Sequence, residues 1–293
     1  MKKRKNLVYL VVFLFLFLLP VQVRADMGPK PSVVIDFIGI EDEEYYVTLL
    51  SKTDSTGPWS YGNDYYEYMG DEAVFQKFNE YRDSDGYYFL SFMENCSGDD
   101  QFEWTYYPPT EFKILIYFPE YQYFVTCDQV CERYAFDSYF TVELEYCTAE
   151  ADQDAHYIID KIELSYKYTM EIVSLFIRII LTIAVECGIA WIFHYRDKKS
   201  ITIIFKANLC TQLLLNLLLN MINYKSGQYA FVFHYIWMEI VVFVIEAIIY
   251  DKKIGRENPI TKNKYHQYGY AAIANLVSLI VGLIIAKSIP GIF

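Results

Sequence analysis

The sequence has little histidine, and its long apolar stretches contain no aspartate, which together narrow the chemistry that it can support. Only four His are present, and within residues 26–165 only His156 occurs. Intramembrane aspartyl hydrolases need paired Asp, and zinc sites need clustered His. His194 and His234 fall towards opposite ends of their apolar stretches, and no GxSG-like motif supports a serine nucleophile. We therefore expect no enzyme, no cofactor and no metal site; a chance carboxylate pair among the acidic residues is the remaining enzymatic alternative.

Acidic residues are missing from the N-terminus, and charge is divided unevenly along the rest of the chain. Residues 1–25 hold five basic residues and no acid. Residues 26–165 carry 30 acids against 7 Lys and Arg, whereas residues 166–293 carry 7 acids against 13 Lys and Arg. A segment with a charge of −23 repels nucleic-acid phosphates, so we expect no nucleic-acid partner and favour cations or a cationic partner.

The first 25 residues have the three-part form of a secretory signal. The basic start MKKRKN precedes the apolar run LVYLVVFLFLFLLPV, and QVRA follows that run. This pattern predicts a signal peptide over residues 1–25 that is cleaved after Ala25, with an uncleaved signal anchor as the alternative. In either case residues 26–165 are expected on the extracytoplasmic side.

Four further apolar stretches follow residue 165, at about 170–193, 201–223, 229–250 and 268–289. Each is long enough for a helix to cross the hydrocarbon layer, which takes about 20 residues. The loops 194–200 and 251–266 together hold eight Lys and Arg, whereas the opposite side offers only Lys225 and Lys287. The positive-inside rule therefore places both loops in the cytoplasm and predicts a multi-pass protein of the cell membrane.

Residues 26–165 are rich in short β-branched and aromatic runs separated by turn signals. The runs are SVVIDFIGI, EYYVTLLS, GYYFLSFM, EFKILIYF, YQYFVTC and DSYFTVELEY. The first two flank the acidic turn EDE, which predicts a hairpin. One amphipathic helix is expected over residues 71–82, with Asp71 as its cap and with Val74, Phe75, Phe78 and Tyr81 on one face. Short strands with turns between them predict a β-sandwich.

The predicted fold class is therefore an α+β two-part membrane protein. An extracytoplasmic, all-β, sandwich-like domain with one short helix covers residues 26–165. A four-helix transmembrane bundle covers residues 166–293. The membrane bilayer is thus an expected partner.

Aromatic residues are concentrated in the predicted outer domain, which holds 18 Tyr and two Trp. Tyr can bury its ring in a sandwich while its hydroxyl stays in water, which accounts for most of them. The cluster WSYGNDYYEYMG at residues 59–70 lies between predicted elements and has the Tyr, Ser, Gly and Asn mixture of antibody loops. It gives a candidate ligand loop of Trp59, Tyr61, Tyr65 and Tyr66.

Four cysteines of the outer domain are candidates for disulfides in an oxidising compartment. They are Cys96, Cys127, Cys131 and Cys147. Three pairings are possible, and we expect at least one disulfide, with Cys96 bonded to Cys127 or Cys131. A metal site at Cys127 and Cys131 lacks any nearby His.

The segment from Asp83 to Gly86 reads DSDG and matches the first part of a calcium loop. The remaining oxygen ligands and the closing Glu are not at the required spacing. A tight turn is therefore the preferred interpretation, with loose calcium binding as the alternative.

Each predicted span carries one polar stripe when its residues are placed on a helical wheel. The second span is the most polar, with five side-chain amides on one face: Asn208, Gln212, Asn216, Asn220 and Asn223. Inward-facing stripes of this kind form hydrogen bonds between helices, and each such bond contributes about 0.6 kcal/mol on average.

Depth along the helices divides the ionisable residues into two layers. The outer layer contains Arg178 and Glu239, which we expect to form a structural ion pair. The inner layer contains Glu186, Glu246, Asn208 and Asn275. Two close carboxylates in a low dielectric cannot both stay charged without a cation, so this layer is a candidate proton or cation site.

With both halves considered, the chain resembles an uncharacterised family of integral membrane proteins from low-GC Gram-positive bacteria. The stretches that carry the resemblance are GPKPSVVIDFIG, YYVTLLS, STGP, YYPPTEFKILIYFPE, RYAFDSYF, NLCTQLLLNLLLNMINY and FVIEAIIY. The resemblance implies the two-part architecture and implies no activity.

Two functions of different classes remain. The first is an outer domain that binds an envelope ligand or partner, in a sensor or accessory subunit of a membrane complex with another membrane or envelope protein. The second is a small transporter, as a homo-oligomer or alone, that uses Glu186 and Glu246 as a proton or cation site. The cytoplasmic loops are too short for a signalling domain, so sensing requires a partner protein.

Overall fold

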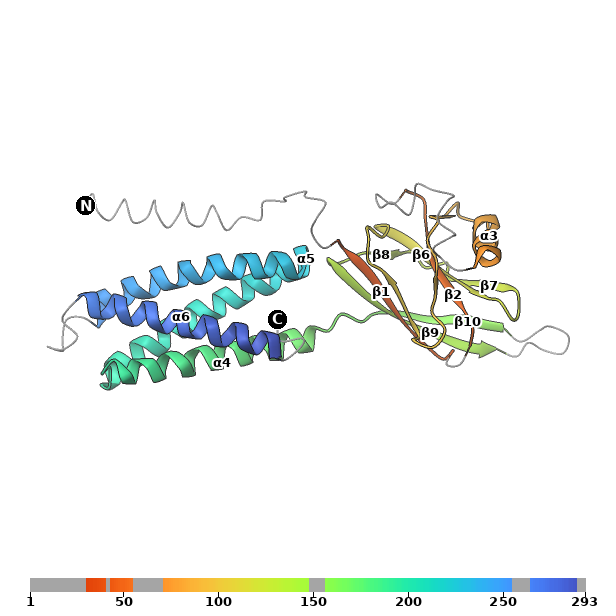
Figure 1. The fold of residues 1–293 in the computed structure, drawn as a ribbon. Helices are drawn as coiled ribbons and strands as arrows, with labels where there is room; N and C mark the ends of the chain where they lie inside the picture. The colour runs from red at the N-terminus through yellow and green to blue at the C-terminus, as the bar shows by residue number, and fades with distance from the viewer. Residues whose placement is uncertain (1–29, 41–42, 55–70, 148–155, 255–263, 289–293) are drawn as a thin grey trace. The chain divides into compact units, whose positions relative to one another are not determined.

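The computed structural model describes residues 30–40, 43–54, 71–147, 156–254 and 264–288. The chain divides into a β unit of residues 29–166 and a helical unit that includes residues 167–293 (Figure 1). A β-sheet region is therefore followed by helices along the chain, in the order that the sequence predicts.

Two sheets make up the β unit. Sheet 1 has the order β10 (His156–Leu164), β9 (Asp137–Cys147), β1 (Ser32–Ile38) and β5 (Gln101–Trp104). Sheet 2 has the order β3 (Tyr88–Phe89), β2 (Tyr46–Ser51), β6 (Glu111–Phe118) and β7 (Tyr123–Thr126). The short strands β4 (Glu94–Asn95) and β8 (Cys131–Glu132) also pair with β2 and β6. Among the described strands, β1 and β9 form the one parallel pair.

The inward faces of both sheets share one hydrophobic core. Val33 and Ile35 of β1 and Val47 and Leu49 of β2 are fully buried in it, and so is Trp104 of β5. Alternate residues of a strand point to opposite faces, which explains how one side of each strand fills this core. Each such apolar side chain contributes about 1.5–3 kcal/mol through burial.

The hairpin expected between the first two strands is wrong. β1 lies in sheet 1, where it pairs with β5 and β9, whereas β2 lies in sheet 2 beside β6. The connection crosses from one sheet to the other after Gly39, which has φ +94°. A Cβ at this glycine would lie 2.3 Å from the carbonyl oxygen of Leu144, so β9 packs directly against the crossing.

The helix expected near residue 71 is confirmed as α3 (Glu72–Glu80). The Asp71 side chain accepts hydrogen bonds from the backbone N–H groups of Ala73 and Val74, which caps the helix. Its apolar face packs on the outer face of sheet 2 through a second core that includes Phe78, Leu115 and Tyr117.

The helical unit contains α4 (Tyr168–Ile192), α5 (Lys198–Lys253) and α6 (Lys264–Ser288). Both α4 and α5 are long and apolar enough to cross a membrane, by length and composition. α5 is interrupted at Gly227, whose φ of 78° and ψ of 175° are not helical. Hydrogen bonds join Asn208 to Tyr250 and Thr211 to Glu246, so the two halves of α5 lie antiparallel, side by side.

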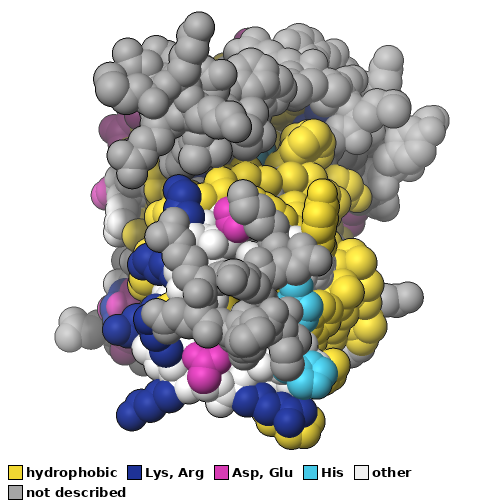
Figure 2. All heavy atoms as spheres, turned by 90° about the vertical axis from the view of Figure 1, so that its left-hand side faces the viewer, with side chains coloured by type: hydrophobic (Ala, Val, Ile, Leu, Met, Phe, Trp, Pro, Cys, Tyr) yellow, Lys and Arg dark blue, Asp and Glu magenta, His cyan; other side chains and the backbone are white. Residues whose placement is uncertain are grey.

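Basic side chains gather at the end of the helical unit where α4 leads into α5 (Figure 2). Asp197 caps α5 there, because its Oδ2 accepts a hydrogen bond from the backbone N–H of Ser200 at 2.8 Å. The exposed basic residues at this end are Arg196, Lys198, Lys199, Lys252 and Lys253.

Candidate functional site

A layer of polar side chains is buried within the helical unit. Glu186 of α4, Asn208 and Glu246 of α5 and Asn275 of α6 have exposed fractions of 6% or less. The structure therefore places the four residues of the predicted inner layer away from solvent, on three different helices.

Glu246 is held by donors from two helices. Thr211, on the other half of α5, donates through its hydroxyl to Glu246 Oε1 at 2.6 Å. Asn275 of α6 donates through Nδ2 to Glu246 Oε2 at 2.9 Å. The same Nδ2 also donates to the carbonyl oxygen of Ala271. Each carboxyl oxygen of Glu246 thus has a hydrogen-bond partner on another helix segment.

Glu186 has no comparable support. Within the described part of the chain, neither of its carboxyl oxygens has a hydrogen-bond partner, and the same is true of Asn208 Oδ1. Asn208 and Ser278 are its polar neighbours, and Glu246 lies within electrostatic range. The Nδ2 of Asn208 donates to the Tyr250 hydroxyl at 3.1 Å. Glu186 is therefore a buried carboxyl whose oxygens can accept further hydrogen bonds.

The predicted proton or cation site can be described by the groups that surround the two carboxyls. No described Lys or Arg forms an ion pair with Glu186 or Glu246. Among the described residues no group of three or more potential metal-binding side chains comes together. Two ionised carboxylates in one low-dielectric site repel each other, which leaves a shared proton and a bound cation as the two alternatives for this layer.

The ion pair expected between Arg178 and Glu239 does not form in the structure. Arg178 Nη2 donates to Asn220 Oδ1 at 2.8 Å, and the guanidinium lies 5.5 Å from the centroid of the Phe231 ring. The neighbours of the Glu239 carboxyl are instead Tyr235 and Gln212. The position of a residue along a helix gives its depth but does not determine which residue lies beside it. The guanidinium of Arg178 therefore bonds to Asn220, an amide of the Asn-rich stripe.

A small cavity lies between α4, both halves of α5 and α6. Its volume is about 20 Å³, which is enough for one water molecule. Its lining combines the polar residues Arg178, Thr182, Gln212, Asn216, Tyr235 and Ser278 with Gly282 and the apolar residues Ile177, Leu181, Val185 and Val281.

The sequence analysis did not identify several polar residues that form buried or partly buried hydrogen bonds in the helical unit. Thr211 could have been found, because it lies three residues after Asn208 and next to the same helix face. Tyr195, Tyr270 and His266 come from predicted loops or span ends and carried no signal. Tyr270 donates to the backbone oxygen of Glu186 at 3.2 Å, and the Tyr195 hydroxyl lies 3.0 Å from His266 Nδ1.

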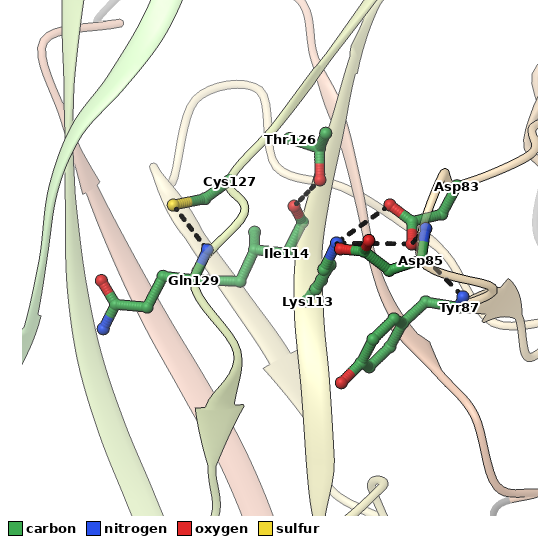
Figure 3. A network of polar contacts seen from close by, with 8 residues as sticks. All are labelled: Asp83, Asp85, Tyr87, Lys113, Ile114, Thr126, Cys127 and Gln129. Carbon is green, nitrogen blue, oxygen red and sulfur yellow. Dashed lines mark hydrogen bonds and ion pairs between the residues drawn. The ribbon is translucent and has the colours of Figure 1, made fainter.

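The DSDG turn of the β unit holds a lysine ammonium where the calcium-loop alternative would place a metal. Lys113 of β6 is fully buried and lies 3.2 Å from Asp83 Oδ1, and its Nζ also contacts Asp85 (Figure 3). Asp83 Oδ2 accepts from the backbone N–H groups of Asp85 and Tyr87, which forms the tight turn that the sequence favours.

The turn contacts reverse the usual effect of burial on both partners. Burial alone would raise the pKa of Asp83, but hydrogen bonds from Lys113 and from two backbone N–H groups outweigh it and lower this pKa. Burial alone would lower the pKa of Lys113, but its contacts with Asp85 and Asp83 raise it. Both groups are charged in the folded protein, which makes this a structural ion pair.

The cysteines of the β unit are separate thiols where the structure describes them. Cys96 and Cys131 are buried, and Cys127 is partly exposed. Burial, followed by the nearby Cys127, raises the pKa of the Cys131 thiol to about 11. The side chain of Cys147 lies outside the described residues, and so does the candidate ligand loop with Trp59, Tyr61, Tyr65 and Tyr66.

Exposed acidic side chains lie on the outer face of sheet 1. Its strands alternate core residues with exposed polar ones, so Glu143 and Glu145 of β9 point outward while Val142 and Leu144 point inward. The outward residues of the neighbouring strands add Gln101, Glu103, Ile158, Lys161 and Glu163. Sheet 2, by contrast, is covered on its outer face by α3.

Comparisons with family models, with curated proteins and with solved structures gave no match.

Proposed function

We propose that this chain is a multi-pass membrane protein that recognises a partner with its β unit and serves as a sensor or accessory subunit of a membrane complex. In this proposal residues 26–165 form an extracytoplasmic sandwich, and the two halves of α5 act as separate spans, giving a four-helix bundle. Loops 194–200 and 251–266 then lie in the cytoplasm. The exposed basic residues at the α4–α5 end support this orientation.

The apolar surface of the helical unit supports its place in the bilayer. Soluble monomers rarely expose large contiguous apolar patches. Here the described helices expose many large apolar side chains, among them Ile172, Phe176, Ile180, Leu213, Leu214, Leu217, Phe233, Ile236, Ile240, Leu276 and Ile280. Polar side chains such as Gln212 and Asn216 are buried instead, as a helix needs when lipid is its solvent.

The proposed recognition role rests on the exposed acidic residues of the outer face of sheet 1. Exposed carboxylates at Glu103, Glu143, Glu145 and Glu163 outnumber the single lysine, Lys161, on this face. A partner with a basic surface fits this charge, since opposite potentials steer association and fix its orientation. We therefore propose an envelope or membrane protein with a basic patch as the partner.

The short link between α4 and α5 supports an accessory role. Only the five residues 193–197 separate the two helices. A segment of this length cannot form a catalytic or signalling domain, since domains have about 50 residues or more. Any signal received outside must then pass to another protein through the helices.

A photo-crosslinking amino acid at Glu143 tests the recognition role. We expect an adduct with one envelope or membrane protein in cells, and we expect the reversal Glu145→Lys with Glu163→Lys to abolish it. The matched control places the crosslinker at Glu80 of α3 and reverses Glu72. An adduct that forms equally at Glu80, or that survives the sheet 1 reversal, would reject this face as the binding surface.

A second function is favoured by Glu186 and Glu246. We propose as the alternative that the helical unit transports a proton or a cation through this buried pair, as a homo-oligomer or as a single chain. The purified full chain in vesicles, loaded with a pH-sensitive dye, would then show a proton flux. Glu186→Gln with Glu246→Gln should abolish this flux, and a proton flux equal to that of empty vesicles would reject proton transport.

A further inference from the structure

Glu239 is a third buried carboxyl of the helical unit, and neither proposed function uses it. It is 6% exposed and lies on the second half of α5, seven residues before Glu246. Two helical turns separate the two residues, or about 10.5 Å along the axis. Glu239 therefore lies on the same helix face as the buried pair but at another depth.

One carboxyl oxygen of Glu239 and the side-chain nitrogen of the nearby Gln212 have no hydrogen-bond partner among the described residues. Within the described residues, Glu239 Oε2 accepts no hydrogen bond and Gln212 Nε2 donates none, although both are buried. A buried polar atom without a partner costs about 1–3 kcal/mol, so such atoms point to a bound water or ion. Gln212 is a neighbour of the Glu239 carboxyl, so one bridging group can satisfy both atoms.

The cavity lies beside these atoms. Gln212 and Tyr235 line it, and both are neighbours of the Glu239 carboxyl. Its volume of about 20 Å³ holds one water. The polar side chains around it offer the two to four hydrogen bonds that a buried water needs.

We propose that a water in this cavity solvates the Glu239 carboxyl and that Glu239 exchanges its proton with this water. The inference stands apart from the second proposed function, because Glu239 exchanges with the cavity and the Glu186–Glu246 pair takes no part in the step. A proton passes from a hydronium ion in the cavity to a Glu239 oxygen and leaves again to a cavity water. No electron moves, and no other bond is made or broken.

The charged groups around Glu239 agree with a neutral carboxyl in the resting protein. Arg178 lines the same cavity, but its guanidinium donates to Asn220 and faces the ring of Phe231. Glu246 lies on the same helix face, and its negative charge disfavours a second one nearby. Tyr235 and Gln212, the polar neighbours of the Glu239 carboxyl, carry no charge.

Infrared spectroscopy of the full chain in lipid nanodiscs, transferred into D₂O, tests the proposal. A protonated carboxyl has its own C=O stretching band, and this band shifts when deuterium replaces the proton. We expect two phases of exchange, a fast one from Glu239 through the cavity water and a slow one from the Glu186–Glu246 pair. Glu239→Gln should remove the fast phase and leave the slow phase.

A variant that fills the cavity tests whether the cavity water, rather than the Glu239 side chain alone, is needed for fast exchange. Gly282→Leu places a side chain in the cavity and should convert the fast phase into a slow one while Glu239 is still present. Gly188→Leu is the control, since a Cβ added at this glycine meets no atom within 4 Å and Gly188 does not line the cavity. A fast phase that persists in Glu239→Gln, or that Gly282→Leu leaves unchanged, overturns the inference.

The two proposals fail in different ways. Loss of the slow phase in Glu186→Gln with Glu246→Gln supports the protonated pair, and a slow phase unchanged by both substitutions rejects it. A wild-type spectrum with no fast phase rejects Glu239 as the exchanging group. It would indicate an ionised Glu239, bridged through water to Arg178, because a carboxylate lacks the C=O band of a protonated carboxyl.

Discussion

Lys113 Nζ lies 3.2 Å from Asp83 Oδ1, and both side chains are almost completely withdrawn from water. Lys113→Met removes the cation and leaves the Asp83 carboxylate buried without its partner. Such a loss destabilises a protein by about 3–5 kcal/mol. We expect the β unit to unfold at a clearly lower urea concentration, measured in the full chain by labelling of the buried thiol of Cys131.

The double variant Lys113→Met with Asp83→Asn is the control for this ion pair, since it removes both charges. It should recover part of the lost stability. A double variant that is no more stable than Lys113→Met would contradict the assignment of the loss to an unpaired charge.

The same ion pair sets how the stability of the β unit depends on pH. The lowered pKa of Asp83 adds stability that is complete above its unfolded value of about 3.9 and is lost as pH falls through the folded value. The raised pKa of Lys113 adds stability that is complete below its unfolded value of about 10.4 and is lost as pH rises through the folded value.

The stability difference between the wild type and the neutral double variant should therefore be largest between about pH 4 and about pH 10. It should shrink on either side of this window, as measured by urea unfolding at a series of pH values. A stability difference that does not change as the pH falls below about 4 would show that the contacts of Asp83 do not hold it ionised.

Thiol labelling should distinguish the described cysteines of the β unit. The thiolate is the reactive form, so a raised pKa and burial both slow the reaction. Burial raises the pKa of Cys96 and of Cys131, the latter to about 11, whereas Cys127 is partly exposed. We expect maleimide to label Cys127 in the folded protein and the other two only after denaturation, as read by peptide mass spectrometry.

The expected Cys96 disulfides can be tested in the same samples. Labelling before and after reduction, with the protein purified without reductant, shows which thiols are paired. Three free thiols at Cys96, Cys127 and Cys131 would reject both of those disulfides.

Much of the β unit depends on contacts that no local pattern contains. α3 was predictable because Asp71 and the apolar face that follows it act within a few residues. The placement of β1 was not, because its partners are β5 and β9, far along the chain. β10 was not expected as a strand, since HYIIDKIEL mixes charges into its apolar positions and pairs with β9 through a bulge.

The helical unit divides in the same way. A period near 3.6 residues puts Asn208, Gln212 and Asn216 on one helix face, and all three are buried. The contacts of that face with other helices depend on rotation and packing, which the period does not contain. Arg178 therefore contacts Asn220, although its depth matches that of Glu239.

Double-mutant cycles should reproduce this pairing. Arg178→Leu and Glu239→Leu are expected to be additive within about 0.5 kcal/mol, as for residues that share no contact. Arg178→Leu with Asn220→Leu should instead show a coupling of about 0.6 kcal/mol or more. Unfolding of the full chain in mixed micelles supplies the free energies. A larger coupling to Glu239 than to Asn220 would restore the ion pair that the sequence suggested.

The hydrogen bond from Asn275 to Glu246 should contribute measurably to the stability of the helical unit. Asn275→Leu with Glu246→Leu should show a coupling of about 0.6 kcal/mol and at most about 1.7 kcal/mol, the range found for polar contacts inside membranes. Thr202→Val is the control, since its hydroxyl is exposed and donates to the backbone of its own helix. A coupling of zero would mean that α6 holds its position without this contact.

The parallel pairing of β1 with β9 also determines the order in which the β unit can be completed. Ser32 Oγ donates to Asp137 Oδ1 across 105 residues of chain. Chains are synthesised from the N-terminus, at about 5–20 residues per second. β1 therefore emerges several seconds before the strand that it must join, and its hydrogen-bonding edge stays unpaired during that time. Such an edge is prone to aggregate, so the nascent chain requires protection until residue 147 has been made.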